Sequence, residues 1–117
     1  MSYRPTIILT GQSGASFTFW IFPSDWQGSN EPGNYVFARP SPLDRWEIVY
    51  IGQTEDFNRR ITEHNQDHLF TEYGITHIFA HVNSDATARY LEEQDLLATF
   101  DPPANKSRVK GQSGGKL

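Results

Sequence analysis

The amino-acid sequence predicts an α+β domain: a small antiparallel or mixed β-sheet of about three core strands flanked by helices, with an extra N-terminal hairpin. Three observations support this class. Short apolar segments separated by turn residues run as far as residue 52, as in hairpins. Two later segments space their apolar residues as a helix does, and a strand-like segment separates them. The 117 residues are enough for one core of two packed layers.

The N-terminal hairpin is predicted by two apolar segments, residues 6–9 and 16–22, on either side of the sequence GQSG. Glycine and serine favour tight turns. The composition of residues 23–34 is that of a loop. We therefore expect residues 1–30 to form an extension that packs on the main domain.

The main domain is expected to span residues 31–105 and to begin with two paired strands. The first, YVFAR, should end at Arg39 because two prolines follow closely. The second, WEIVYIG, should place Trp46, Ile48 and Tyr50 on one face of the sheet. A short turn joins the strands, which makes them an antiparallel pair.

The remaining elements follow in the order helix, strand, helix. Residues 55–66 form the first helix, capped by Thr54 or Asp56. ITHIFAHV, residues 75–82, is the strand. The last helix begins after Ser84 or Asp85 and ends near Phe100, because the sequence Asp-Pro-Pro stops it. Residues 106–117 form a basic, glycine-rich tail.

The composition limits the classes of function. The net charge is −4, but residues 1–105 carry six basic and fourteen acidic side chains, a net of −8. Such a body does not attract nucleic acid in general, so any contact with it needs a local patch. No apolar run reaches the length of a membrane span, and the N-terminus does not resemble a secretory signal. The chain has no cysteine, and we expect a cytoplasmic protein that binds no membrane.

Glu93 is the first candidate functional residue. On a helical wheel it lies in the middle of an apolar arc of about 80°, whereas Glu92 lies on the opposite, solvated side. Burying an unpaired carboxylate costs several kcal/mol, so Glu93 needs a cation, a metal ion, hydrogen-bond donors or a cleft. One interpretation is a structural arginine partner or misplaced helix ends, and the other is an active site. The apolar arc consists of Ala86, Tyr90, Leu97 and Phe100.

The segment YIGQTEDFNRRITEH supplies further candidates. Arg60 and His64 are four residues apart on the first helix and border its apolar stripe. Arg59 points about 100° away from Arg60, toward solvent.

These residues resemble the GIY-YIG nuclease superfamily. Gly33-Asn34-Tyr35 and Tyr50-Ile51-Gly52 are similar to the two motifs that name it. The family has an arginine ten positions after the second tyrosine, which corresponds to Arg60 here, and His64 follows one helical turn later. A helical glutamate, a proline-rich turn and an asparagine then match Glu93 and Asn105. The resemblance covers residues 33–105 and reaches Glu93 independently of the helical wheel.

The resemblance implies an endonuclease that hydrolyses phosphodiester bonds of nucleic acid, DNA before RNA, with one Mg²⁺ or Mn²⁺ ion. Glu93 is the implied metal ligand, and Arg60 the residue that binds the phosphate. Tyr35 is the implied water-side base, and His64 relays its proton or binds phosphate. The implied catalytic set is Tyr35, Tyr50, Arg60, His64 and Glu93; the structural or substrate-contacting set is Gly52, Asn105, Lys106 and Arg108.

Two alternatives remain open at this point. The first alternative is a binding module on the same fold with weak or no catalysis. The second is an oligomer-forming protein in which the N-terminal hairpins of two chains pair with each other. The acidic body motivates the first alternative, with the basic tail as its nucleic-acid contact. A specificity-providing partner or a homo-oligomer is compatible with either the nuclease or the binding module.

Overall fold

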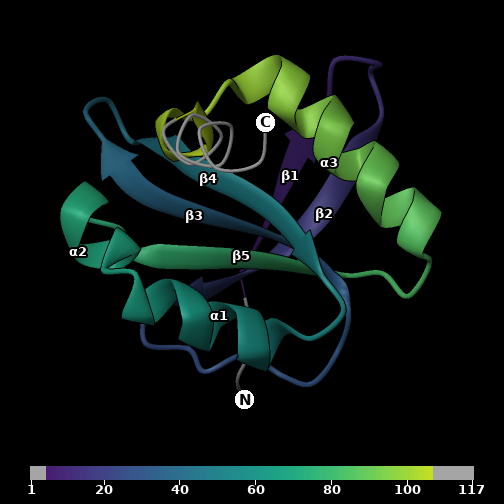
Figure 1. The fold of residues 1–117 in the computed structure, drawn as a ribbon. Helices are drawn as coiled ribbons and strands as arrows, with labels where there is room; N and C mark the ends of the chain where they lie inside the picture. The colour runs from purple at the N-terminus through teal and green to yellow at the C-terminus, as the bar shows by residue number, and fades with distance from the viewer. Residues whose placement is uncertain (1–4, 107–117) are drawn as a thin grey trace.

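The computed structural model describes residues 5–106 as an α+β fold, in which helices pack on a curled, five-stranded antiparallel sheet that resembles a half-barrel (Figure 1). The elements, in chain order, are β1 (Thr6–Thr10), β2 (Ser16–Pro23), β3 (Gly33–Ser41), β4 (Arg45–Thr54), α1 (Phe57–Gln66), α2 (Leu69–Tyr73), β5 (His77–Val82) and α3 (Ala86–Phe100).

The strands lie in the order β1-β2-β5-β3-β4. Strand β3 is therefore flanked by β4 and β5, and the N-terminal hairpin joins the sheet because β2 pairs with β5. The hairpin is present as expected, but its strands continue the main sheet, so the estimate of about three strands describes only the β4-β3-β5 part.

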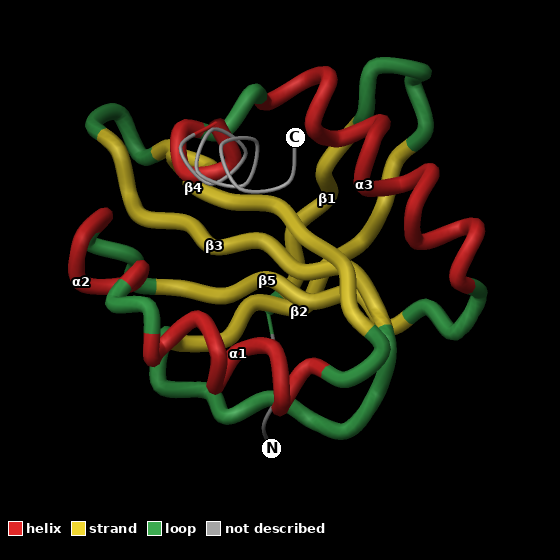
Figure 2. The backbone as a smooth tube through the Cα atoms, viewed as in Figure 1, coloured by secondary structure: helices red, strands yellow, loops and turns green. Residues whose placement is uncertain are grey.

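The two faces of the sheet carry separate apolar clusters, since side chains alternate along each strand. Helix α1 packs on one face against a cluster that contains Tyr35, Phe37 and Ile78. Helix α3 packs on the other face, where Leu96 joins Val36 and other residues of the second cluster. Figure 2 shows α1 and α3 on opposite sides of the strands. The site described below depends on this two-sided arrangement.

A β-bulge in β4 changes which side chains of this strand lie on the same face of the sheet. Phe37 pairs with Tyr50 but Ala38 pairs with Ile48, so Val49 is the extra residue. As a result Tyr50 lies in the α1-side cluster, whereas Ile48 and Trp46 lie in the α3-side cluster. The prediction that Trp46, Ile48 and Tyr50 share a face is wrong, because strict alternation fails at the bulge.

Two other local predictions also differ from the structure. Strand β3 runs on through Pro40 to Ser41, where its pairing with β5 has already ended at Ala38 and only β4 remains beside it. A proline is tolerated there because a strand without a neighbour on one side does not need every N–H. The short helix α2 was not predicted; it follows His68, whose backbone is left-handed, and ends at Tyr73, before the left-handed Gly74.

The helix starts agree with the predicted caps. The Asp56 carboxylate accepts a hydrogen bond from the Arg59 N–H, and the Asp85 carboxylate accepts one from the Ala88 N–H. Each satisfies a backbone donor that the first helical turn leaves free. Helix α3 ends at Phe100, where Asp101 adopts a left-handed backbone and two prolines follow.

The buried face of α3 is turned by roughly a quarter of a circle from the predicted one. Arg89, Glu92 and Leu96 are buried, whereas Tyr90 is exposed. The prediction that Glu92 faces solvent is wrong, since its carboxylate is satisfied by His81 of β5 at 2.9 Å from Nδ1. Glu93 lies at the edge of this face and is partly buried.

Asn105 closes the outer edge of β4. Its side-chain Oδ1 accepts a hydrogen bond from the Ile51 N–H at 2.8 Å, and its Nδ2 donates to the Ile51 carbonyl at 2.8 Å. The amide thereby replaces a neighbouring strand at that point and holds the segment after α3 against the sheet.

No helix within residues 5–106 is long and apolar enough to cross a membrane.

Replacing Asn105 by alanine should lower the free energy of unfolding by about 1–3 kcal/mol, because two backbone groups of Ile51 lose their partner. Urea denaturation of Asn105→Ala measures the loss. Asn65→Ala is the control, since Asn65 is exposed on α1. Equal stability of the two variants would show that the β4 edge does not need the amide.

Candidate functional site

The hydroxyl of Tyr35 is the centre of a buried hydrogen-bond network. It lies 2.8 Å from His64 Nε2 and accepts a hydrogen bond from Arg60 Nε at 3.3 Å. Tyr35 is 0% exposed and His64 is also buried. Strand β3 and helix α1 are thus joined by polar side chains at the place where the sequence puts its candidate residues.

Gly52 leaves room for the Tyr35 phenol. A Cβ atom at position 52 would lie 2.5 Å from the Tyr35 hydroxyl oxygen and 2.6 Å from its Cζ. These distances are shorter than a side chain can tolerate without movement. The glycine that follows the second tyrosine is therefore required by the ring of the first.

Tyr50 completes an aromatic cluster around His64. The Tyr50 and His64 ring centroids are 5.0 Å apart, and those of Tyr50 and Tyr35 are 6.0 Å apart. The edge-on contacts of His64 with Tyr50 and Phe37 fix the orientation of the imidazole. The Val49 bulge is what turns Tyr50 toward this cluster.

Burial keeps Tyr35 a neutral phenol at physiological pH. Loss of hydration raises its pKa well above the usual value, Tyr50 acts in the same direction, and the charge of Arg60 opposes them. Burial also tends to lower the pKa of Arg60, but Tyr35 and Glu63 outweigh it, so that pKa is raised and the guanidinium stays charged. A phenolate at Tyr35 is consequently disfavoured.

Arg60 spans the boundary between this network and solvent. Its Nη1 also forms an ion pair with Glu63 at 3.0 Å, and a substantial part of its side chain is exposed. Exposed ion pairs of this type contribute about 0–1 kcal/mol. Tyr35, itself bonded to His64, therefore holds one side of a guanidinium whose other side can exchange Glu63 for another anion.

Glu93 has no ion-pair partner within 4.0 Å in the described part of the chain. Burial raises the pKa of its carboxyl, and the charge of Arg60 is the main influence in the opposite direction. Of the three acids in the middle of α3, Glu92 binds His81 and Asp95 binds Ser13, whereas Glu93 has a side-chain hydrogen bond with its neighbour Gln94 and the more distant charge of Arg60.

Three arginines surround a pocket of about 280 Å³ at the C-terminal end of β4. Arg59 and Arg60 come from α1, and Arg89 comes from α3. Figure 1 shows the first turns of both helices approaching the tip of β4. The remaining lining residues are Gln53, Thr54, Glu55 and Ala86. The pocket thus has an excess of positive charge on a chain that is acidic overall.

Sequence reasoning missed Arg89, which is 4% exposed. Its Nε donates to the Gln53 side-chain oxygen at 3.0 Å and its Nη1 to the Asn83 carbonyl at 3.1 Å. Its own carbonyl accepts a hydrogen bond from buried Asn34 at 3.0 Å. The sequence feature that could have identified Arg89 is its spacing: it precedes Glu92 by three residues and Leu96 by seven, which places all three on one face of the helix.

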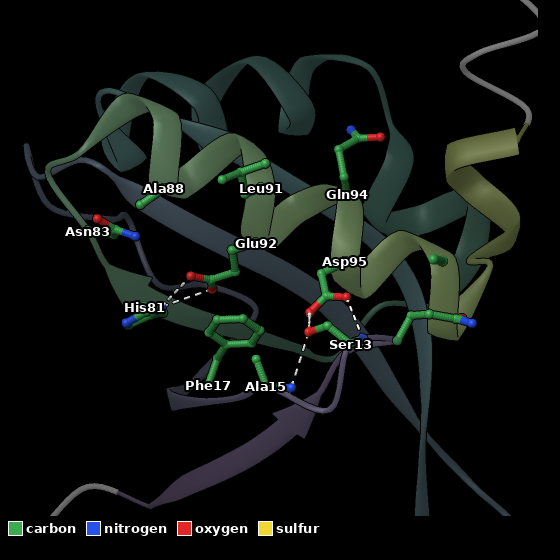
Figure 3. A pocket seen from close by; sticks show the side chains of 12 residues that line it. Ser13, Ala15, Phe17, His81, Asn83, Ala88, Leu91, Glu92, Gln94 and Asp95 are labelled. Carbon is green, nitrogen blue, oxygen red and sulfur yellow. Dashed lines mark hydrogen bonds and ion pairs between the residues drawn. The ribbon is translucent and has the colours of Figure 1, made fainter.

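A second hollow, of about 690 Å³, lies between α3 and the β1–β2 hairpin (Figure 3). In this view Glu92 points toward His81 and Asp95 toward Ser13, so both acids that face the hollow are bound by protein donors. Phe17 and Leu91 supply apolar surface. This hollow lies apart from the arginine pocket, and none of the predicted catalytic residues lines it.

The predicted set is thus only partly assembled. Tyr35, Tyr50, Arg60 and His64 are brought together, and Glu93 lies within the electrostatic reach of Arg60. Lys106 forms an exposed ion pair with Asp101 at 3.0 Å. Arg108 lies outside the described residues. Within residues 5–106 no three His, Asp or Glu side chains gather in a way that would hold a metal ion by themselves.

Comparisons of the chain with models of protein families, with curated proteins and with solved structures found no match.

Replacing Tyr35 by phenylalanine should lower the free energy of unfolding by about 1–3 kcal/mol, because buried His64 and Arg60 both lose a partner. Chemical denaturation measures this, with Tyr90→Phe as the control because Tyr90 is exposed. If Tyr35→Phe is no less stable than Tyr90→Phe, the network does not contribute to stability.

Replacing Glu93 by glutamine should stabilise the fold at pH 7. A carboxyl whose folded pKa is raised costs stability that grows as the pH rises from the ordinary glutamate range to the folded pKa and is complete above it, and the cost disappears below the ordinary glutamate range. The melting temperature of Glu93→Gln should therefore exceed that of the wild type by a few degrees at pH 7, since less than about 1 kcal/mol suffices. The difference should shrink as the pH falls toward 4.

Exposed Glu72 supplies the control, because Glu72→Gln removes the same charge without a burial effect. A Glu93→Gln variant that melts below the wild type at pH 7 would mean that the carboxylate is stabilised by a contact in the folded protein.

Proposed function

We propose that this chain is a metal-dependent endonuclease that hydrolyses phosphodiester bonds in nucleic acid, with DNA as the first substrate to test. The observation that carries the proposal is the position of Arg60. Its guanidinium is held by Tyr35 beside a pocket that two further arginines line, and its charge acts on Glu93, an acid without an ion-pair partner among the described residues.

Arg60 supplies phosphate binding in this proposal. A guanidinium presents planar, paired donors that match two phosphate oxygens. Arg59 and Arg89 add positive charge at the same pocket, which offsets the repulsion between an acidic protein and nucleic acid. This is the local patch that the overall charge makes necessary.

Glu93 is the proposed metal ligand. Mg²⁺ takes oxygen ligands, keeps several waters and commonly uses only one or two protein carboxylates, so a single half-buried glutamate suits it. A zinc site built from protein ligands would need more donors than the described residues gather. When bound, the cation would neutralise charge on the phosphate and lower the pKa of coordinated water.

Tyr35 and His64 act as positioning residues for Arg60 and as a path for a proton. Hydrolysis forms a bond from a water oxygen to phosphorus, breaks the bond from phosphorus to an ester oxygen, and releases the water's proton. Because Tyr35 is a buried phenol, it can pass a proton on to His64 Nε2 as it receives one, without becoming a free phenolate. This refines the expected role of Tyr35 as water-side base.

The fold is proposed to be GIY-YIG-like in the region of β3, β4, α1, β5 and α3. The pairing of β3 with β4 sets Tyr35 opposite Gly52, and α1 then supplies Arg60 and His64. This support comes from residue placement alone.

One observation favours a second candidate, a nucleic-acid-binding module with little or no catalysis. Tyr35 has no exposed surface and Tyr50 has little, so neither hydroxyl reaches solvent freely in this conformation. A module of this kind would need only the arginines, which do reach the pocket.

Nicking of supercoiled plasmid in Mg²⁺ or Mn²⁺ tests the proposal. The wild type should nick, and Glu93→Gln should lose at least about a hundredfold in rate, the typical cost of removing a group that stabilises charge in a transition state. Glu72→Gln should keep the wild-type rate, since Glu72 is exposed on α2, away from the pocket. Chelation by EDTA should abolish nicking.

A further variant, Arg60→Gln, separates the two candidates. If no protein nicks plasmid or single-stranded RNA but wild type binds labelled DNA more tightly than Arg60→Gln, the binding module is correct and the nuclease is wrong. Equal nicking by wild type and Glu93→Gln would reject the assigned metal ligand.

A further inference from the structure

Strand β1 is an open edge of the sheet. It pairs with β2 on one side and has no neighbour on the other within residues 5–106. Pro5 and Gly11 hydrogen-bond toward β2, to Ile21 and Ala15 respectively. Because hydrogen-bonding direction alternates along a strand, the odd-numbered positions point inward. The backbone N–H and C=O groups of Thr6, Ile8 and Thr10 therefore point outward.

The opposite edge of the sheet, strand β4, is covered at one position by a side chain of the same protein. At β4 the side-chain amide of Asn105 occupies the N–H and C=O of Ile51. At β1 nothing comparable is present in the described chain, and Thr6, Ile8 and Thr10 are all exposed. Proteins usually protect such an edge with lysine, proline or a bulge, and β1 contains none of these.

The sequence of β1 is complementary to itself. Read in the two opposite directions, TIILT places threonine against threonine, isoleucine against leucine, and the central Ile8 against its own copy. An antiparallel pair of two β1 strands centred on Ile8 therefore matches side chains of similar shape at every position. Cross-strand pairs of β-branched residues are favourable in sheets.

Electrostatics also allow contact between two copies here. Residues 5–23 contain no charged side chain, in a protein of which 21% of residues are charged. Two copies of an acidic chain repel each other, and a two-fold axis places like charges opposite one another. The uncharged hairpin is a surface where that repulsion is smallest.

An exposed apolar surface lies beside this edge. Ile8 is 64% exposed, and Trp20, two strand positions away on β2, is 46% exposed. Their side chains share the α1-side face, because Thr18 pairs with Ile8 and Trp20 pairs with Ala80 of the α1-side cluster. Pairing two β1 strands would bring two such surfaces into one continuous patch.

We propose that the binding partner of this edge is a second copy of the chain, and that two β1 strands pair antiparallel about a two-fold axis at Ile8. The two sheets then form one continuous sheet across the dimer. This contact uses the same surface of both copies, so it closes at two, and at β4 the Asn105 amide interrupts the other edge at Ile51. The inference is independent of the proposed nuclease activity.

Analytical ultracentrifugation tests the assembly. The average mass of the wild type should rise with concentration toward twice that of the monomer and then level off. Ile8→Lys should stay monomeric, because it places two charges against each other at the axis. Leu43→Lys is the matched control and should dimerise like the wild type, since Leu43 is 86% exposed at the β3–β4 turn, far along the chain from β1.

Amide hydrogen exchange of the unmodified protein supplies a second readout that needs no variant. At high concentration the amides of Thr6, Ile8 and Thr10 should become protected, whereas those of Ile7 and Leu9, which already bond to β2, should not change. A mass that stays monomeric at all concentrations, a dimer that survives Ile8→Lys, or exchange at Thr6, Ile8 and Thr10 that does not depend on concentration would overturn the proposal.

Discussion

The candidate site depends on one buried hydroxyl. The Tyr35 oxygen must satisfy its hydrogen bonds inside the protein, and it does so with His64 and Arg60 of α1. That requirement fixes the distance of α1 from β3. It also demands a glycine at position 52, because any side chain there would occupy the space of the phenol. A tyrosine, a glycine, an arginine and a histidine at these spacings are therefore parts of one packing arrangement.

The acidic side chains of α3 differ in the partners that the fold gives them, and this difference distinguishes the site from the rest of the protein. Glu92 and Asp95 of α3 are hydrogen-bonded to His81 and Ser13, which lie on other elements. Glu93 bonds only to its helix neighbour Gln94 among the interactions that act on its carboxyl at short range, and burial makes its ionised form costly. Acids whose pKa is perturbed and that lack an ion-pair partner are typical of functional sites, since a stable fold gains nothing from them.

The features that could be predicted from the sequence are those that neighbouring residues determine, such as the starts and ends of helices. The caps Asp56 and Asp85 were among those predicted, and the end of α3 at Phe100 follows from the residues beside it. What the sequence could not predict depends on contacts between distant segments. The bulge at Val49 moves Tyr50 to the other face, and the pairing of β2 with β5 adds the hairpin to the sheet. The buried face of α3 was misplaced because the wheel counted Glu92 as polar, whereas His81, eleven residues earlier, makes its burial possible.

The measurement that tests the site most directly uses NMR to detect the paramagnetic broadening of protein signals by Mn²⁺. It is made in the presence of a short, non-hydrolysable oligonucleotide. The account predicts that amides around Glu93 and the Arg60 side chain broaden together in the wild type, and that Glu93→Gln abolishes the effect. Broadening that persists in Glu93→Gln, or that occurs only at other acids of this chain, would contradict the assignment of Glu93 and Arg60 to a metal-assisted phosphodiester site.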